Sequence, residues 1–256
     1  MAIDPYHHLP FETASRPVTG LVMDYPRGHV IASHKHTRAQ FLYATRGVMV
    51  VETKRGHWVV PPTRGVWLQA HIEHTVRMSG AVHMRTLFVD PDAAPDLPNE
   101  DCVLNVSPLL RELVLEASRI PMDYDAETRD GRLMRLLLDE IQTLPVLPFH
   151  LPWPEDKRLL RVCTQLARQP DDPTTIDQWA THLAMSPKTF HRQFKAHTGI
   201  TFGRWRQLAR LLLSLESLAE GKPIVQVALE HGYNSQSAYA AMFKRHFGMP
   251  PSVFYI

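Results

Sequence analysis

Apolar residues recur with helical spacing in the last hundred residues, and the same pattern occurs twice. The first copy places them at i, i+3, i+4 and i+7, the spacing of one apolar helix face: Ile176, Trp179, Ala180 and Leu183. The second copy repeats this face with Ile224, Val227 and Ala228. We therefore predict two short amphipathic helices that begin two similar helical units.

Each copy continues through a turn into a second helix. Ser186 and Ser235 are typical N-cap residues, Pro187 fits a first helical position, and Gly232 fits the second turn. The apolar positions then match at an offset of 49, with Phe190 and Phe194 followed by Tyr239 and Phe243. These patterns predict helices over 187–197 and 235–247, separated by a leucine-rich core helix over about 202–220. Two such units predict entry into two successive major grooves of DNA.

The first part of the chain has the short alternating runs of a β-rich domain. We predict strands at 40–44, 48–53, 58–60, 65–68, 75–78 and 84–89, with a hairpin turn at Lys54–Gly56. Strands at this spacing indicate a small barrel or jelly roll. From Asp90 prolines interrupt the pattern, and helices over about 108–119 and 126–144 follow.

A proline-rich segment at 145–154 predicts an extended, stiff connector. The expected fold class is α+β with two domains. We expect a cupin-like β-barrel sensor domain over 1–90, a helical linker with connector over 91–154, and an all-α domain over 155–256 with two helix-turn-helix motifs.

Charge is divided unevenly along the chain. Residues 1–150 carry 15 Lys and Arg against 18 Asp and Glu, whereas residues 151–256 carry 13 against 8. The positive charge thus lies with the repeated motif, as attraction to phosphates requires. Two lone cysteines, Cys102 and Cys163, and the lack of a long apolar run predict a cytoplasmic protein with no membrane contact.

The C-terminal pattern resembles the DNA-binding domain of the AraC/XylS family of transcription regulators. Residues 156–256 carry the resemblance, most closely in the second motif, which runs from Ile224 through Gly232 and Ser235 to Phe243, Lys244 and Gly248. The resemblance implies a transcription regulator that binds double-stranded DNA. It further implies an activator that contacts RNA polymerase.

Particular side chains are then expected to meet DNA. In the first reading helix, Lys188, His191 and Arg192 would face bases and Lys195 would meet phosphate. In the second helix the matching positions hold Gln236, Ser237 and Ala241, with Lys244 near the backbone. Because Ala241 stands where other members have a basic residue, we predict that the first motif carries most specificity and the second mainly clamps.

The β-rich part resembles the first cupin motif, with glutamine in the place of the usual glutamate: Gly28, His34, His36, Gln40 and Gly47. Pro62, Gly65 and His74 resemble the second motif more loosely. His34 and His36 on one strand would point to the same side, and His74 on another would complete a set of three. We expect a small-molecule effector pocket formed by His34, His36, Gln40, His74 and Tyr43.

Three neutral imidazoles can also hold a divalent metal such as Zn²⁺, Fe²⁺ or Ni²⁺, although the Gln40 amide is a weaker ligand than a carboxylate. The alternatives are therefore an organic-effector sensor, a metal sensor that uses His34, His36 and His74, or a metal-dependent cupin enzyme with an appended DNA-binding domain. The first is preferred, with no certain cofactor and no enzymatic activity. The helices over 105–144 would transmit the signal or pair two chains as a homodimer.

Overall fold

The computed structural model describes residues 9–62, 64–93, 96–147 and 150–254. The chain divides into two compact units between His150 and Leu151, and the short segment Lys54–Val59 belongs to the second unit. The first unit is rich in β-strands and the second is helical, which confirms the predicted fold class. The division into parts at 1–90, 91–154 and 155–256 stays a prediction.

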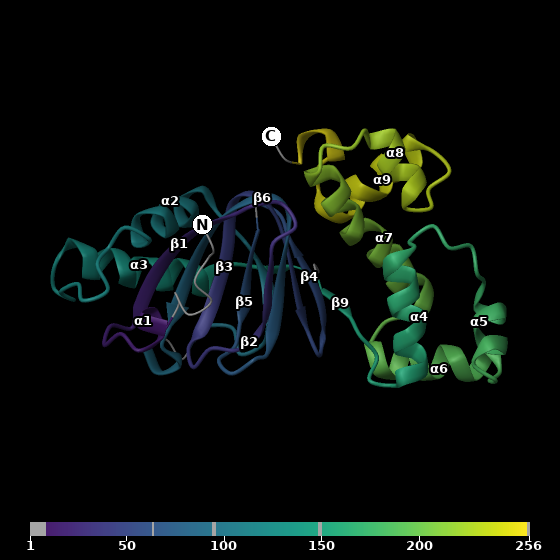
Figure 1. Ribbon diagram of the computed structural model, residues 1–256, viewed down its shortest axis with the longest axis horizontal. Helices are drawn as coiled ribbons and strands as arrows, with labels where there is room; N and C mark the ends of the chain where they lie inside the picture. The colour runs from purple at the N-terminus through teal and green to yellow at the C-terminus, as the bar shows by residue number, and fades with distance from the viewer. Residues whose placement is uncertain (1–8, 63, 94–95, 148–149, 255–256) are drawn as a thin grey trace. The chain divides into compact units, whose positions relative to one another are not determined.

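An antiparallel sheet forms the body of the first unit (Figure 1). Its strand order is β1-β6-β3-β5-β7-β8, and β2 also pairs with β6. The strands have the following bounds: β1 Val18–Tyr25, β2 Val30–His34, β3 Ala39–Thr53, β5 Arg64–Leu68, β6 His74–Val89, β7 Cys102–Asn105 and β8 Val146–Leu147. β4 (Gly56–Val60) and β9 (His150–Pro152) complete the set in the described residues.

Two strands are much longer than the sequence pattern predicts. β3 joins the expected strands at 40–44 and 48–53, and β6 joins those at 75–78 and 84–89. The pairing of β3 with β6 shifts register on either side of Arg46, where the strand bulges. Gly47 has φ 81°, and a Cβ there would lie 2.3 Å from the Ala81 carbonyl oxygen. Glycine therefore lets the strand bend and continue where the sequence suggests a break.

Alternate residues of β3 and β6 point to opposite sides of the sheet. Phe41, Tyr43, Leu87 and Val89 face helices α2 (Pro108–Ala117) and α3 (Arg129–Thr143), which cover this side of the sheet. We call this side the helix face. The other side, the inner face, is defined by the cross-strand partners Gln40 and Phe88, and Leu42 and Thr86, all of them buried.

Three short elements of the first unit fall outside the predicted pattern. The strand β7 follows the proline-rich stretch, where we expected the strands to have ended. Helix α1 (Leu9–Glu12) precedes β1, and a short 3₁₀ helix, η1, spans Pro91–Ala93. The connector expected to be extended contains the short strands β8 and β9, as its prolines predict.

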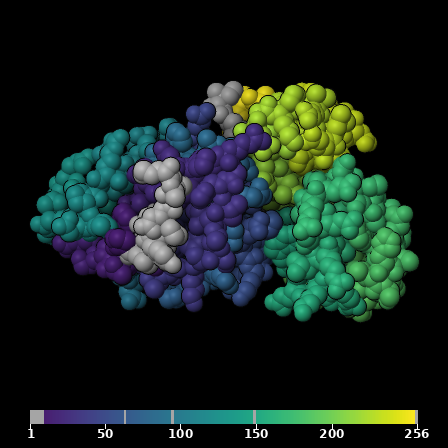
Figure 2. Space-filling model, viewed as in Figure 1, coloured from purple at the N-terminus to yellow at the C-terminus, as the bar shows by residue number. Residues whose placement is uncertain are grey.

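The second unit contains the two predicted helix pairs on either side of a long helix (Figure 1). The helices are α4 Lys157–Arg168, α5 Ile176–His182, α6 Pro187–Thr198, α7 Phe202–Ala219, α8 Ile224–Glu230 and α9 Gln236–Phe247, with a final 3₁₀ helix η2 at Pro251–Val253. The predicted boundaries of α6, α7 and α9 differ from the observed ones by one residue. Figure 2 shows the α5–α6 pair in green and the α8–α9 pair in yellow-green as separate lobes.

The two pairs have the same backbone hydrogen bonds at their turns. Met185 N donates to Ala180 O and Tyr233 N donates to Ala228 O, each over 2.9 Å and 48 residues apart in sequence. The left-handed residue of the turn is Ala184 in the first pair, with φ 52°, and Gly232 in the second, with φ 72°. The repeat read from side-chain spacing is thus also a repeat of backbone conformation.

Caps fix both ends of the second helix in each pair. The Ser186 hydroxyl accepts a hydrogen bond from Thr189 N, and the Ser235 hydroxyl accepts one from Ala238 N, both over 3.2 Å. Gly199 and Gly248 end the helices in the left-handed conformation that favours glycine. The two serine caps predicted the starts of these helices to within one residue.

Helix α7 supplies the core between the two pairs. Trp205, Leu211, Leu212 and Leu215 are fully buried along it. Its polar residues also hold neighbouring segments, since Ser214 Oγ lies 2.8 Å from the Tyr239 hydroxyl of α9. None of the helices in the described residues combines the length and the apolar character needed to cross a bilayer.

Candidate functional site

Helix α6 presents one apolar and one basic side. Phe190 and Phe194 are fully buried and their rings stack on one another with centroids 5.8 Å apart. All four residues expected to meet DNA are exposed on the rest of the helix: Lys188, His191, Arg192 and Lys195. Burial of the two phenylalanines therefore fixes which side of α6 faces outward.

Helix α9 has the same division with different chemistry outside. Tyr239, Phe243 and Phe247 are buried. The exposed positions include the expected Gln236, Ser237 and Lys244, together with Ala241. Arg245 is also exposed in the last turn, and the sequence interpretation did not name it. Its position next to Lys244 was the available signal, because two adjacent basic residues cannot both lie on the buried side.

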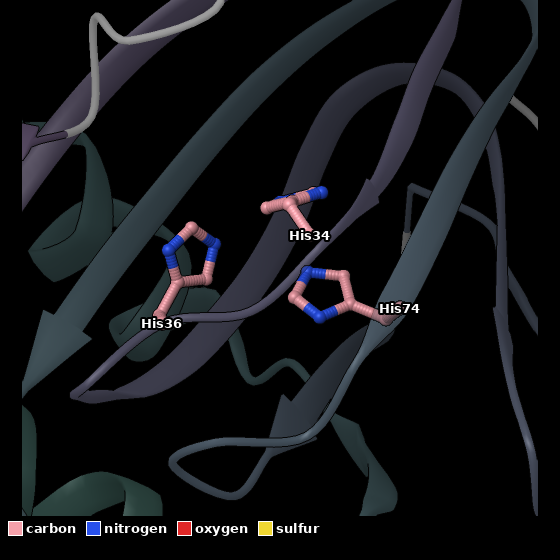
Figure 3. Close-up of side chains that lie close together, drawn as sticks. All are labelled: His34, His36 and His74. Carbon is pink, nitrogen blue, oxygen red and sulfur yellow. The ribbon is translucent and has the colours of Figure 1, made fainter.

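The first unit brings three histidines together (Figure 3). His34 is the last residue of β2, His74 is the first of β6, and His36 follows the end of β2. The ring centroids are 4.8 Å apart for His34 and His36, 4.3 Å for His34 and His74, and 5.3 Å for His36 and His74. One potential ligand nitrogen from each ring lies within 4.8 Å of the others.

The prediction that His34 and His36 lie on one strand was wrong. His34 and His36 do not share a strand, because β2 ends at His34. Residues beyond a strand end do not follow the two-residue alternation, so the spacing alone cannot place His36. The contact of His36 with the ring of Phe88, at 5.0 Å between centroids, places it next to the inner face.

Each of the three histidines has its Nδ1 atom next to an oxygen. His34 Nδ1 lies 2.8 Å from Ala32 O, and His74 Nδ1 lies 2.9 Å from Ile72 O. His36 Nδ1 lies 2.8 Å from the carboxylate oxygen Oε1 of Glu12. All three Nδ1 atoms therefore have an acceptor, and two of these acceptors belong to the backbone.

Glu12 is the site residue that sequence interpretation missed. Its second carboxylate oxygen, Oε2, accepts hydrogen bonds from the backbone N–H and the hydroxyl of Thr37. Its backbone carbonyl accepts a hydrogen bond from Arg38 Nε, over 2.9 Å. Glu12 thus reaches the histidines from α1, more than twenty residues away in sequence, and no local motif pointed to it.

The remaining expected pocket residues lie on opposite sides of the sheet. Gln40 is on the inner face, the side that His36 contacts through Phe88. Tyr43 is on the helix face within the core formed with α2 and α3, so the structure does not bring it to the histidines. The two residues are three apart on β3, and the two-residue period of a strand separates them. Burial raises the pKa of Tyr43, which keeps its hydroxyl neutral.

Two polar atoms on the inner face have no hydrogen-bond partner within the described residues. They are Gln40 Oε1 and Thr86 Oγ1, and both are buried. An unsatisfied buried polar atom costs free energy, and a bound molecule with matching groups can recover it. The inner face therefore carries two buried oxygens whose hydrogen-bonding capacity is not met within the described residues.

Both halves of the chain match known protein families. Residues 21–172, more than half of the chain, match the AraC-like ligand binding domain, and residues 179–255 match a helix-turn-helix domain. The HTH-type transcriptional regulator NimR of Escherichia coli K12 is 31% identical over 218 residues, which cover 85% of this chain and 80% of NimR.

Other relatives match smaller parts or differ more in sequence. The HTH-type transcriptional regulator RipA of Corynebacterium diphtheriae is 31% identical over 144 residues, covering 56% of this chain and 40% of RipA. The structure of unsaturated fatty acid-bound ToxT from Vibrio cholerae aligns over 94% of this chain and 95% of its own, at 11% identity and a TM-score of 0.38.

NimR, which matches 85% of this chain, is a transcriptional regulator, and neither it nor the matched families support a cupin enzyme with a DNA-binding tail. The repeated helix pairs agree with the matched helix-turn-helix domain, and the β-rich unit agrees with the matched ligand-binding domain. The chain belongs to the AraC family of DNA-binding transcriptional regulators, with an AraC-like ligand-binding domain before its helix-turn-helix domain.

Proposed function

We propose that the chain is a transcription activator that reads DNA mainly through α6, clamps it through α9, and responds to a small molecule bound at the inner face of the first unit. The main observation in support of DNA reading by α6 is that its basic side chains are exposed while Phe190 and Phe194 are fully buried on its other side. This arrangement leaves Lys188, His191 and Arg192 as the outward side chains near the helix start, the part that enters the groove in helix-turn-helix proteins.

The division of labour between the helices follows from their exposed side chains. Arg192 can donate two hydrogen bonds to the O6 and N7 atoms of guanine, which discriminates between bases by about 1–3 kcal/mol. In α9, Ala241 has no group that can read a base edge. Gln236 can pair with adenine, while Ser237 and Lys244 are suited to the backbone. Base specificity is therefore concentrated in the first motif.

The effector site rests on the inner face. Gln40 and Thr86 each present a buried oxygen with no hydrogen-bond partner in the described part of the chain, and His36 contacts Phe88 on the same face. A ligand with hydrogen-bond donors and a flat apolar part would satisfy these atoms and pack on Phe88. Such a ligand changes DNA binding only if its affinity differs between two arrangements of the protein.

Two pairs of exposed apolar side chains support the proposal that the chain contacts other proteins. Leu109 on α2 and Leu136 on α3 are 48% and 43% exposed, and we assign these side chains to the contact through which two copies pair as a homodimer. Val225 and Leu229 are one turn apart on α8 and are 50% and 56% exposed. We assign this second pair to contact with RNA polymerase, because α8 is the supporting helix of its motif and α9 is the reading helix.

Selection of bound sequences from random DNA, followed by binding measurements with variants, tests the proposal. Arg192→Ala should lose about 1–3 kcal/mol of base discrimination in one half-site. Lys244→Ala should weaken specific and random DNA alike and reduce the salt slope by about 1. Arg111→Ala, exposed on α2, is the control and should change neither. Equal losses on specific and random DNA for Arg192→Ala would contradict the reading role of α6.

A further inference from the structure

We propose that His34, His36 and His74 bind one divalent transition-metal ion through their Nε2 atoms, with Glu12 as the positioning residue for His36. The metal-binding step stands on the histidine geometry alone. Its role as the signal, or as the anchor for the effector, rests on the proposed function. The proposal thus names a class of ligand for the ligand-binding domain, namely a divalent metal ion that imidazole nitrogens bind well.

The hydrogen bonds determine which nitrogen of each ring carries a proton. A backbone carbonyl can only accept, so Nδ1 of His34 and Nδ1 of His74 must be the donors to Ala32 O and Ile72 O. The Glu12 carboxylate likewise accepts from Nδ1 of His36. In the neutral rings, Nε2 is then the atom with the lone pair, and neutral imidazole is the form that binds metals.

This pattern is the one found around metal-binding histidines. There, the nitrogen that does not bind the metal donates its N–H to a carboxylate or a backbone carbonyl, which fixes the tautomer and the ring orientation. The present cluster has two carbonyl acceptors and one carboxylate. A histidine placed only to fill space in the core would not need the same atom oriented in all three rings.

The positions of the rings fit a single ion after a small adjustment. The ligand nitrogens lie within 4.8 Å of one another. Bonds of about 2.0–2.1 Å from zinc to nitrogen, at tetrahedral angles, separate the nitrogens by about 3.3 Å. Closing a gap of 4.8 Å to this separation takes a shift of about 1.5 Å, which small rotations of the three rings can supply.

Glu12 is held in place by its own contacts, so it can orient His36. Its second carboxylate oxygen is bound by Thr37, and its backbone carbonyl by the buried Arg38. The carboxylate and the ring are only 6% and 3% exposed. In this dry environment a charge-assisted hydrogen bond is strong, and it makes the imidazole a better metal ligand.

Three protein ligands leave at least one coordination position for another group. Zn²⁺ with three histidines commonly keeps a fourth position for water or another ligand. The neighbouring inner face carries the unsatisfied Gln40 Oε1, which lies on the same side of the sheet as Phe88 and His36. An anionic or nitrogen-containing effector could therefore bind the metal and the inner face together.

Titration of the full-length, untagged protein with Zn²⁺ and with Co²⁺ tests the site. Calorimetry should show one high-affinity site per chain, and Co²⁺ should give the visible absorption of a low-coordinate nitrogen site. His34→Ala and His74→Ala should abolish this site. Glu12→Gln should weaken metal affinity by about 10–100-fold while the stoichiometry stays at one, because it alters only the acceptor that orients His36. Unchanged affinity in the histidine variants would overturn the proposal.

His83→Ala is the matched control, since His83 lies on the same strand as His74, nine residues further along, and is only half-buried. It should bind Zn²⁺ as the wild type does. Circular dichroism of each variant without metal separates loss of ligation from loss of folding, and His34, which is only half-buried, is the variant that costs the least packing.

Operator binding with and without Zn²⁺ distinguishes failure of the metal site from failure of the proposed function. If Zn²⁺ does not bind at the histidines while DNA binding is normal, the metal site is wrong and the DNA-reading role stands. If Zn²⁺ binds but wild-type operator affinity is the same with and without it, with or without candidate effectors, the regulatory role of the metal is wrong. If Zn²⁺ changes the operator affinity of the wild type but not that of His74→Ala, the result supports both the metal site and its regulatory role.

Discussion

Ala184 occupies a backbone conformation that its counterpart Gly232 occupies without strain. The two residues are related by the 48-residue repeat, and both have a positive φ. A side chain in the left-handed region costs roughly 1–2 kcal/mol because Cβ approaches the following carbonyl oxygen. The first motif therefore keeps a local strain that the second motif avoids.

Replacing this alanine tests the strain directly. Ala184→Gly should raise the free energy of unfolding by about 0.5–1 kcal/mol, because relief of the strain exceeds the greater entropy that glycine loses on folding. Urea denaturation provides the measurement. Gly232→Ala should instead destabilise, since its Cβ would lie 2.5 Å from the Arg210 guanidinium as well as being strained. A loss of stability in Ala184→Gly would show that the alanine methyl contributes more than the strain costs.

His231 makes the stability of the second unit depend on pH. It is 5% exposed, and burial lowers its pKa below the ordinary value of 6.5. The unfolded chain therefore takes up a proton at a higher pH than the folded chain does. Stability from the neutral buried ring is present above pH 6.5 and is lost as the pH falls toward the folded pKa.

Thermal unfolding from pH 7.5 down to pH 5 should show this loss. His231→Gln keeps a side-chain donor near Val227 O, the acceptor of His231 Nδ1, but does not titrate. Its stability should therefore fall less steeply over the same pH range. A wild-type slope identical to that of the variant would show that another group is responsible for the acid sensitivity.

At the scale of elements, α7 holds both motifs through its arginines. Arg206 donates to the carbonyl groups of Asp172 and Thr174, in the segment that precedes α5. Arg210 donates to Pro170 O over 2.8 Å and to Gly232 O over 3.0 Å, so one side chain joins the segment before the first motif to the turn of the second. Helix α7 is therefore both the apolar core and the polar connection between the two pairs.

Removing the Arg210 guanidinium should be costly. Arg210→Met keeps much of the side-chain length and leaves two carbonyl oxygens without their donor, which predicts a loss of about 2 kcal/mol in the free energy of unfolding. Arg204→Met on the same helix is the control, because Arg204 is exposed and should change stability by less than about 0.5 kcal/mol. Equal effects in chemical denaturation would argue against a connecting role for Arg210.

The elements that local sequence predicts well are those with local causes. Ser186, Ser235 and Gly248 cap their own helices, so the bounds of α6 and α9 follow from nearby residues. The continuous strands β3 and β6 were not predicted, because Gly47 reads as a turn residue and only the approach of Ala81 explains it. Short pieces of strand were predicted correctly, but their union depends on tertiary pairing.

The histidine cluster shows the same limit at a candidate site. His34, His36 and His74 were identified from spacing, and the structure brings them together. The strand alternation that was expected to place His36 does not apply beyond the end of β2. Glu12 could not be found from the sequence, because a carboxylate on α1 meets His36 only when the chain folds back over the sheet.

At the scale of the whole molecule, a single chain carries two reading helices with a fixed separation. Since α7 packs against both pairs, the distance between the two DNA segments they contact should be fixed as well. Inserting 5 base pairs between the two contacted segments turns one of them by about half a turn of the duplex. Affinity for the selected operator should then fall, because α9 loses its contacts with the duplex while α6 keeps its own.

Band-shift titrations on operators with insertions of 0, 5 and 10 base pairs measure this effect. Substitution of the DNA segment contacted by α9, without insertion, is the matched control. It should cost much less affinity, because it retains the spacing and α9 contacts mainly the backbone. Affinity that tolerates the 5-base-pair insertion would indicate that the α5–α6 and α8–α9 pairs move independently.

The two sides of β3 and β6 are also subject to different selective constraints. Positions 41, 43, 87 and 89 must keep their fit to α2 and α3, whereas positions 40, 42, 86 and 88 touch only what lies on the other side. On the proposed function, a descendant lineage can exchange one signal for another by changing every second residue, while the alternate residues preserve the packing of its helices. Selectivity and architecture are inherited on interleaved positions of the same strands.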